Sequence, residues 1–210
     1  DASFSDEAQA QLQGAVDLAV AASGSTGAIV GVWAPWAGTW LKGVGTVAPG
    51  GKETSTSNTF KAGAVTRAMT CDVLYGLVEQ GTVALSDSVT KYVPGLPDHE
   101  AVTLGQLCDS TSGFGTYSDR LNGRFMANPT RTWSPRELVA YGTGSSAAAQ
   151  PGAAFADSDT GYVLLGLALE HAGRKSAAEL LDEFVFTPTG MDATALPAPD
   201  ASASGAGSAV

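Results

Sequence analysis

The supply of β-strands is the feature that most limits how this chain folds. Two runs rich in Val, Ile and Trp, at Ala28–Pro35 and Thr39–Gly50, are separated by a short polar break and predict a β-hairpin. Residues 53–60 (ETSTSNTF) read as the approach to another strand, and every later periodic segment is helical. Because a two-stranded sheet is not stable alone, either the helices cover the hairpin or strands are missing after the end of this chain.

The helices are predicted from apolar spacing and from capping residues. Residues 64–80 place apolar side chains on one face, and Gly81 follows as a C-terminal cap. Ser134 and Pro135 are a typical N-cap and first helical residue. The predicted helices are residues 8–22, 64–80, 102–108, 134–142, 160–173 and 176–186.

Charge and cysteine content exclude several classes of function. With a net charge of -10, the chain lacks the basic surface that a protein uses to bind nucleic acids or anionic membranes. No apolar run approaches the ~20 residues of a membrane span. The chain starts at Asp1 without Met, so we expect a removed leader and a secreted or cell-envelope location. With two cysteines outside any Cys-x-x-Cys pair and two histidines, we expect neither a metal site nor a cofactor.

A sharp corner precedes the helix predicted at residues 64–80. Gly63 lies at this corner with small residues beside it. A helix N-terminus offers free N–H groups and a positive dipole end, so hydrolases hold a reactive hydroxyl there. In this chain the position carries Ala64, and one turn later the sequence has Arg67.

Four sequence blocks stand in an order typical of one family. They are residues 59–97 (TFKAGAVTRAMTCDVLYGLVEQGTVALSDSVTKYVPGLP), 102–115 (VTLGQLCDSTSGFG), 134–142 (SPRELVAYG) and 151–194 (PGAAFADSDTGYVLLGLALEHAGRKSAAELLDEFVFTPTGMDAT). Across nearly the whole chain they resemble the serine β-lactamase-like family, in the branch of class C β-lactamases and secreted D-Ala-D-Ala carboxypeptidases. The resemblance implies an α/β (α+β) fold, in which helices flank an antiparallel sheet and an all-helical subdomain adjoins it.

The same resemblance implies how the chain is divided. Residues 1–63 correspond to the N-terminal helix and strands of the α/β subdomain. Residues 64–191 correspond to the helical subdomain, and the Ala-, Ser-, Pro- and Gly-rich residues 192–210 to a tail or truncated connection. The family's C-terminal strands have no counterpart, so we expect them to be absent from this chain.

The family's catalytic motifs are degenerate here. Its Ser-x-x-Lys pair falls on Ala64 and Arg67, which supply neither a nucleophilic atom nor a base. Its Tyr-x-Asn motif falls on Asp157, Ser158 and Asp159, so the phenol and the amide are both gone. The third motif, Lys/His-x-Gly on an edge strand, has no counterpart. The resemblance therefore predicts no catalytic residues at these five positions.

Other segments imitate catalytic motifs, and each has a simpler interpretation. Residues 88–91 spell Ser-x-x-Lys in a surface turn, and residues 118–120 imitate Ser-Asp-Asn inside a polar loop. Residues 171–173 imitate His-x-Gly at a helix C-terminus, where the His favours the dipole and the Gly caps. His99 lies in a turn. Neither histidine aligns near Ala64, which disfavours a Ser-His-Asp triad.

Cys71 and Cys108 can be read in two ways. Cys71 lies two helical turns beyond Ala64, on the same face, and Cys108 lies in a block that packs near this helix in the family. The resemblance therefore favours a Cys71–Cys108 disulfide. The alternative is two buried free thiols.

Three functional hypotheses follow from these patterns. The favoured one is a pseudoenzyme, a secreted binding or assembly module whose groove takes a cell-wall peptide or glycan. The second is a hydrolase of the same family with displaced chemistry at Arg67, Asp157 and Asp159. We expect the two carboxylates to diverge into solvent, which disfavours a glycosidase-like pair. The third is a structural subunit whose missing strands come from a partner chain or from self-association through the sheet edge.

Overall fold

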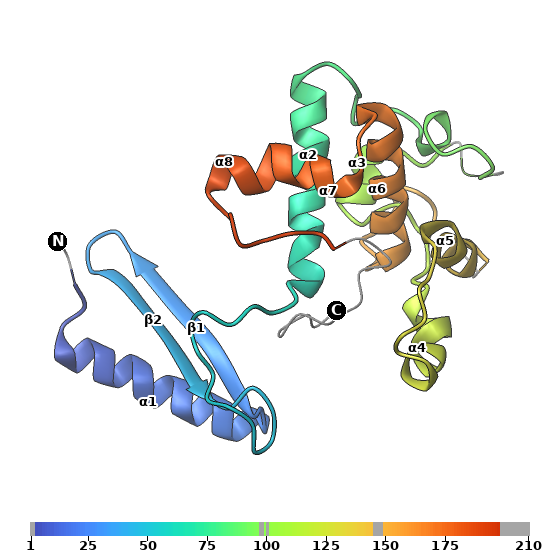
Figure 1. Cartoon of the computed structure of the whole chain (residues 1–210). Helices are drawn as coiled ribbons and strands as arrows, with labels where there is room; N and C mark the ends of the chain where they lie inside the picture. The colour runs from blue at the N-terminus through green and yellow to red at the C-terminus, as the bar shows by residue number, and fades with distance from the viewer. Residues whose placement is uncertain (1–2, 97–98, 100, 145–148, 198–210) are drawn as a thin grey trace. The chain divides into compact units, whose positions relative to one another are not determined.

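The chain divides into two compact units (Figure 1). The structure is a computed structural model that describes residues 3–96, 99, 101–144 and 149–197. The first unit runs to Lys61, and the second begins at Ala62. Residues 198–210, most of the stretch expected to form a tail, lie outside the described residues.

The first unit consists of one helix and a β-hairpin. The two strands pair antiparallel, and Gly38 takes a left-handed φ of 80° where the second strand begins. A residue of this kind after a three-residue loop is typical of a hairpin whose turn is followed by a bulge. The predicted hairpin is confirmed. The elements are α1 (Asp6–Ser23), β1 (Gly27–Ala34) and β2 (Gly38–Gly45).

The second strand is shorter than the sequence predicts. β2 ends at Gly45, whose left-handed φ of 71° turns the chain, whereas the predicted strand continued to Gly50. Thr46 then pairs with Glu53 in an isolated bridge. The rest of residues 53–60 forms no strand, so the expected strand approach is wrong.

The first unit has a small core. Val16 of α1 and Val30 of β1 line the same groove as Trp40 of β2. Among the described residues of this unit, Trp40 is the only buried one, with 4% of its surface exposed. Trp33 and Trp36 at the hairpin end are exposed. This unit therefore gains little stability from its own packing.

The second unit is helical and contains the main core. Leu74, Leu107 and Leu164 come from three different helices and are almost completely buried within one apolar cluster. The predicted helices at 64–80, 102–108, 134–142 and 160–173 are confirmed, with ends shifted by a few residues. The elements are α2 (Thr66–Glu79), α3 (Leu104–Cys108), α4 (Ser118–Ala127), α5 (Pro135–Thr143), α6 (Asp159–Gly173), α7 (Ala177–Leu181) and α8 (Thr187–Thr189).

Helix α4 corrects the expectation of a polar loop at residues 118–120. The segment begins a ten-residue helix in which Leu121 is fully buried. Phe125, one turn later, makes an edge-to-face contact with Trp133 at a centroid distance of 5.3 Å. Two apolar side chains in a polar stretch are enough to hold the helix, but they are too few for a clear period in the sequence.

The C-terminal end of α6 also differs from the sequence prediction. Gly173 was expected to cap the helix, but it is the last helical residue, and Arg174 takes the left-handed conformation with φ 55°. A Cβ on Gly173 would lie 2.9 Å from the Leu180 side chain, so the glycine allows α7 to approach α6. The segment predicted as one helix at 176–186 is α7 followed by a π-helix at Asp182–Phe186.

None of the helices in the described ranges is both long enough and apolar enough to pass through a membrane.

Candidate functional site

The candidate site begins at the start of α2. Gly63 has a φ of 54°, a conformation that L side chains rarely adopt, and it forms the expected corner. Ala64 lies in a 3₁₀ turn at Gly63–Val65, and Arg67 lies in the first turn of α2. The helix that was predicted from residue 64 therefore becomes α-helical at Thr66. The methyl group of Ala64 has no atom that can attack a carbonyl.

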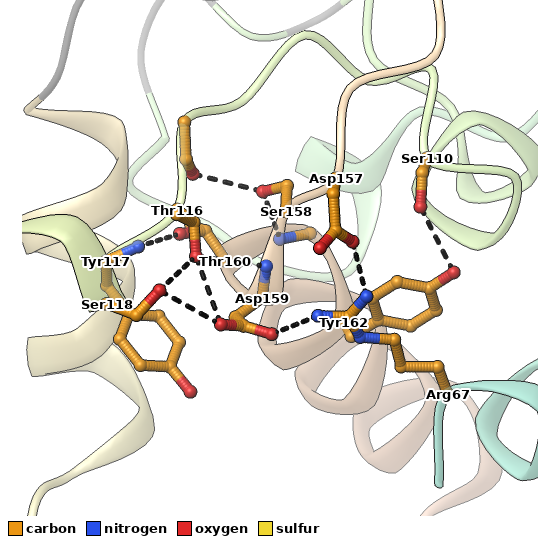
Figure 2. Close-up of polar contacts among 12 residues, drawn as sticks. Arg67, Ser110, Thr116, Tyr117, Ser118, Asp157, Ser158, Asp159, Thr160 and Tyr162 are labelled. Carbon is orange, nitrogen blue, oxygen red and sulfur yellow. Dashed lines mark hydrogen bonds and ion pairs between the residues drawn. The ribbon is translucent and has the colours of Figure 1, made fainter. Parts of the chain in front are cut away.

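Arg67 binds two carboxylates at once. Its Nη1 pairs with Asp157 Oδ1 and its Nη2 with Asp159 Oδ1 (Figure 2). The side chain of Arg67 is 25% exposed, and those of Asp157 and Asp159 are 61% and 33% exposed. The expectation that the two carboxylates diverge into solvent is therefore wrong, because both converge on one guanidinium.

The backbone around Ser158 explains why the two carboxylates meet. Ser158 is extended, with φ -150° and ψ 104°. In extended backbone, side chains two residues apart point to the same side, and the residue between them points to the other. Ser158 accordingly turns inward, where its hydroxyl donates to the Gly115 carbonyl at 3.0 Å and accepts from the Gly161 N–H at 3.2 Å. Asp157 and Asp159 are left on the Arg67 side.

Asp159 is held by more than Arg67. Its Oδ2 accepts hydrogen bonds from Thr116 Oγ1 at 3.1 Å and from Ser118 Oγ at 3.2 Å. Asp159 is also the first residue of α6, where the helix dipole favours a negative charge. Both carboxylate oxygens of Asp159 therefore have partners within the protein.

A close contact between α5 and α6 positions the neighbouring Tyr117. A Cβ on Gly142 would lie 1.9 Å from Thr160 Oγ1, so only glycine lets the two helices meet at this point. Thr160 is fully buried, and its Oγ1 accepts the Tyr117 N–H at 3.1 Å. This contact therefore places Tyr117 beside Asp159 (Figure 2).

Tyr162 supports Arg67 from the other side. The Arg67 guanidinium carbon lies 5.3 Å from the centre of the Tyr162 ring, within the range of a cation–π contact. The Tyr162 hydroxyl donates to the Cys108 carbonyl at 2.7 Å and lies 3.2 Å from Ser110 Oγ. The Tyr162 ring, which contacts the Arg67 guanidinium, is therefore held by a hydrogen bond to the last residue of α3.

A disulfide joins α3 to α2 beneath this site. Cys71 and Cys108 are bonded, with a Cα–Cα distance of 5.6 Å. The structure therefore agrees with the disulfide that the family resemblance favoured and not with two free thiols. Cys71 follows Arg67 by one helical turn, so the bond ties the Arg67 side of α2 to the residue that holds Tyr162.

Two pKa shifts describe the electrostatics of the site. Partial burial disfavours the charge on Arg67, but hydrogen bonds to Asp159 and Asp157 outweigh it and raise the pKa of the guanidinium. Burial, with the nearby Asp159 carboxylate, raises the pKa of the Tyr117 phenol. Both groups therefore keep their protons at neutral pH, and neither can serve as a general base.

A cavity of about 480 Å³ opens beside these residues. Ala64, Arg67, Tyr117 and Asp159 lie on its polar side. Its apolar side is formed by residues of α6 and α7, among them Leu180. Volume and lining are those of a small-molecule or peptide site, with a few polar groups beside an apolar surface.

The other imitations of catalytic motifs take no part in the cavity lining. Residues 88–91 form a short 3₁₀ turn in which Lys91 pairs with Asp87 at 3.0 Å. His99 contacts the Phe114 ring at 4.9 Å, and His171 lies near another aromatic ring. In the part of the chain that the structure describes, no three His, Cys, Asp or Glu side chains gather as metal ligands would.

Sequence reasoning missed four residues of this site. Tyr162 lies three residues after Asp159, on the same helical face, so the helical period could have identified it. Thr116, Tyr117 and Ser118 follow directly after one of the family blocks. Their position relative to Asp159 depends on the Gly142 contact, for which the sequence carries no signal.

Comparisons with solved structures identify the fold. The octameric penicillin-binding protein homologue from Pyrococcus abyssi superimposes with a TM-score of 0.74 and 26% identity, over 87% of this chain and 43% of that one. A D-stereospecific amidohydrolase from Streptomyces sp. gives a TM-score of 0.72 and 25% identity, over 81% of this chain and 51% of that one. The expected α+β fold of serine β-lactamases and transpeptidases is therefore confirmed.

Sequence comparison identifies the family. The D-alanyl-D-alanine-carboxypeptidase/endopeptidase AmpH of Escherichia coli (strain K12) is 33% identical over 143 residues, 65% of this chain and 36% of that protein. The chain spans about a third of the length of the curated relatives it matches, 31% and 36% for two of them. The model of the family described as β-lactamase matches residues 11–209. Because that match includes almost every residue, this chain belongs to the β-lactamase family.

Proposed function

We propose that this chain is a non-hydrolytic member of the β-lactamase family, a pseudoenzyme that binds or assembles. One observation carries the proposal. At the start of α2, where the family resemblance places the nucleophile and the lysine, the chain has Ala64 and an Arg67 that is bound to Asp157 and Asp159. A hydrolase needs a nucleophile and a base at these positions.

The size of the chemical loss supports a binding role. Removing the nucleophile of a serine hydrolase alone lowers kcat by about 10⁶-fold. An arginine cannot replace the missing base, because it does not deprotonate in proteins. The Tyr117 phenol also lines the cavity, and its raised pKa keeps it neutral.

Displaced hydrolytic chemistry at Arg67, Asp157 and Asp159 has less support. Asp159 Oδ1 is bound by Arg67 and Oδ2 by Thr116 and Ser118, so three of the roughly four lone-pair sites of this carboxylate are already used within the protein. Asp157 is mostly exposed to water. A general base or covalent nucleophile would have to break existing contacts before reacting.

The cavity beside Ala64 supports a ligand of the family's kind. It has the volume of a peptide site and keeps polar groups beside an apolar wall. The relative AmpH is named as a carboxypeptidase and endopeptidase acting at D-alanyl-D-alanine. We therefore propose a cell-wall peptide or glycan as the ligand, and a secreted or cell-envelope location for the protein.

A labelled penicillin tests the proposal. After incubation, intact mass spectrometry is expected to show no covalent adduct, and assays with β-lactams and D-Ala-D-Ala peptides no hydrolysis. An active family member treated in parallel serves as the positive control. The double variant Ala64→Ser/Arg67→Lys is expected to regain little activity, because Asp157 and Asp159 remain in the second motif. An adduct on the unmodified chain would refute the proposal.

A further inference from the structure

Helices α4 and α5 carry an unusual concentration of arginine. The chain has a net charge of -10, yet four of its six arginines lie between residues 117 and 144. The same segment contains two carboxylates, Asp119 and Glu137. The two helices contact each other, and they lie next to one another in Figure 1. This segment is therefore positively charged, although the chain as a whole is acidic.

Aromatic rings join two of these arginines, Arg131 and Arg124. Arg131 stacks over Trp133, with its guanidinium carbon 3.8 Å from the ring centre. Trp133 meets Tyr141 at a centroid distance of 6.1 Å, and Arg124 Nη1 donates to the Tyr141 hydroxyl at 2.7 Å. Arg120 precedes Arg124 by one helical turn on the same face of α4. We call these five residues the arginine–aromatic row.

Two of the three arginines of the row are held in place, and both keep free donors. Trp133 and the Glu137 carboxylate, at 2.6 Å, fix Arg131, while Tyr141 fixes Arg124. A guanidinium has five N–H donors, so each retains capacity for another acceptor. Among the described residues, no carboxylate lies within ion-pair distance of Arg120 or Arg124. Preorganised guanidinium groups lose little entropy when they bind a carboxylate.

We propose that the arginine–aromatic row binds a short acidic segment of a partner protein. One helical turn separates Arg120 from Arg124 by about 6 Å along α4. Alternate side chains of an extended peptide lie about 6.8 Å apart on one face. Carboxylates at every second position of such a segment can therefore face both arginines, and its apolar side chains can contact the half-buried rings of Trp133 and Tyr141.

The overall charge of the chain favours a short segment over a long polyanion. A nucleic acid or an extended acidic polymer would also pass over the acidic remainder of the protein and be repelled there. The Debye length at physiological salt is about 8 Å, so a segment of a few residues responds mainly to the charges directly beneath it. This surface is separate from the cavity beside Ala64. The proposal of an acidic partner therefore does not depend on the proposed function.

A pair of synthetic peptides tests the proposal. The probe is a fluorescein-labelled Gly-Glu repeat of eight residues, and its control is the matching Gly-Gln repeat. Fluorescence anisotropy at physiological salt is expected to show binding of the Gly-Glu peptide only. The variant Arg120→Gln/Arg124→Gln is expected to bind it about tenfold more weakly, because it loses two charge-assisted contacts. Circular dichroism confirms that the variant is folded.

A second variant separates the local effect from net charge. Lys42→Gln/Lys52→Gln removes the same charge from exposed positions in the first unit and is expected to leave binding unchanged. The proposal is overturned if the Gly-Glu peptide does not bind, or if both double variants weaken it equally. It is also overturned if a single-stranded oligonucleotide binds more tightly than the peptide and loses affinity in the Arg120/Arg124 variant.

Discussion

At the scale of single residues, Asp157 and Asp159 contact the same guanidinium but are held differently. Asp159 has four stabilising features: Arg67, two hydroxyl donors and the N-terminus of α6. Asp157 has Arg67 and an exposed side chain. Exposed ion pairs contribute little to stability, whereas hydrogen-bonded carboxylates at a helix start contribute measurably.

Two single substitutions measure this difference. Asp159→Asn is expected to lower the free energy of unfolding by about 1–2 kcal/mol, since the charge-assisted contacts and the dipole interaction weaken together. Asp157→Asn is expected to lower it by less than about 0.5 kcal/mol. Urea denaturation of both variants beside the unmodified chain provides the comparison. Equal effects of the two substitutions would contradict the asymmetry seen in the contacts.

The sequence predicted which residues form this site better than it predicted where their side chains point. Ala64 and Arg67 could be assigned because a helix start with a corner glycine has a local signature. The convergence of Asp157 and Asp159 depends on Ser158 being extended and turned inward. That conformation is imposed by Gly115, a residue far away in the sequence, so local reasoning could not anticipate it.

At the scale of elements, local signals located the helices whose caps or apolar faces were strong. The Ser134 side chain accepts the Glu137 N–H at 3.2 Å, and Pro135 is the first residue of α5, as predicted. Helix α4 was missed because its stability comes from Leu121 and from the ring contact of Phe125 with Trp133, just before α5, rather than from its own pattern. Packing between elements therefore determines that these residues are helical, which local propensity alone does not.

The disulfide between α2 and α3 gives a prediction at this scale. The cysteines are 37 residues apart in the sequence, and in the chain-entropy model a loop of that length stabilises the fold by about 4 kcal/mol. Reduction is therefore expected to lower the free energy of unfolding by up to that amount, measured by urea denaturation with and without reductant.

A variant without the bond provides the control for this experiment. In Cys71→Ser/Cys108→Ser, added reductant is expected to have no effect on the unfolding midpoint. Thiol titration of the denatured, unreduced protein is expected to find no reactive group. Two reactive thiols in that titration would contradict the bond.

At the scale of the whole molecule, the first unit leaves its packing incomplete. Its described sheet has two strands, and Trp40 is the only buried residue among those described there. Burial of apolar surface stabilises a protein by about 25 cal/mol per Å². Open strand edges pair readily with other strands. We therefore propose that further strands, from a partner chain or from a second copy, cover this unit.

Self-association or complex formation is the expected behaviour in solution. Light scattering at micromolar concentration is expected to show species larger than one chain, or a hydrophobic dye is expected to bind the isolated chain. Adding a partner that completes the sheet should abolish dye binding. A compact monomer that binds no dye would contradict the proposal.

The charges of Arg67, Asp157 and Asp159 also bear on what the cavity accepts, because Arg67 and Asp159 line it and Asp157 is bound to Arg67. Two carboxylates against one guanidinium leave one excess negative charge, whereas a lysine with neutral partners would leave a positive one. Among the cell-wall peptides and glycans proposed as ligands, we therefore expect those whose end is amidated, esterified or glycosidic to bind better than those that end in a free carboxylate. The replacements at the proposed catalytic positions therefore also predict which ligand ends the cavity favours.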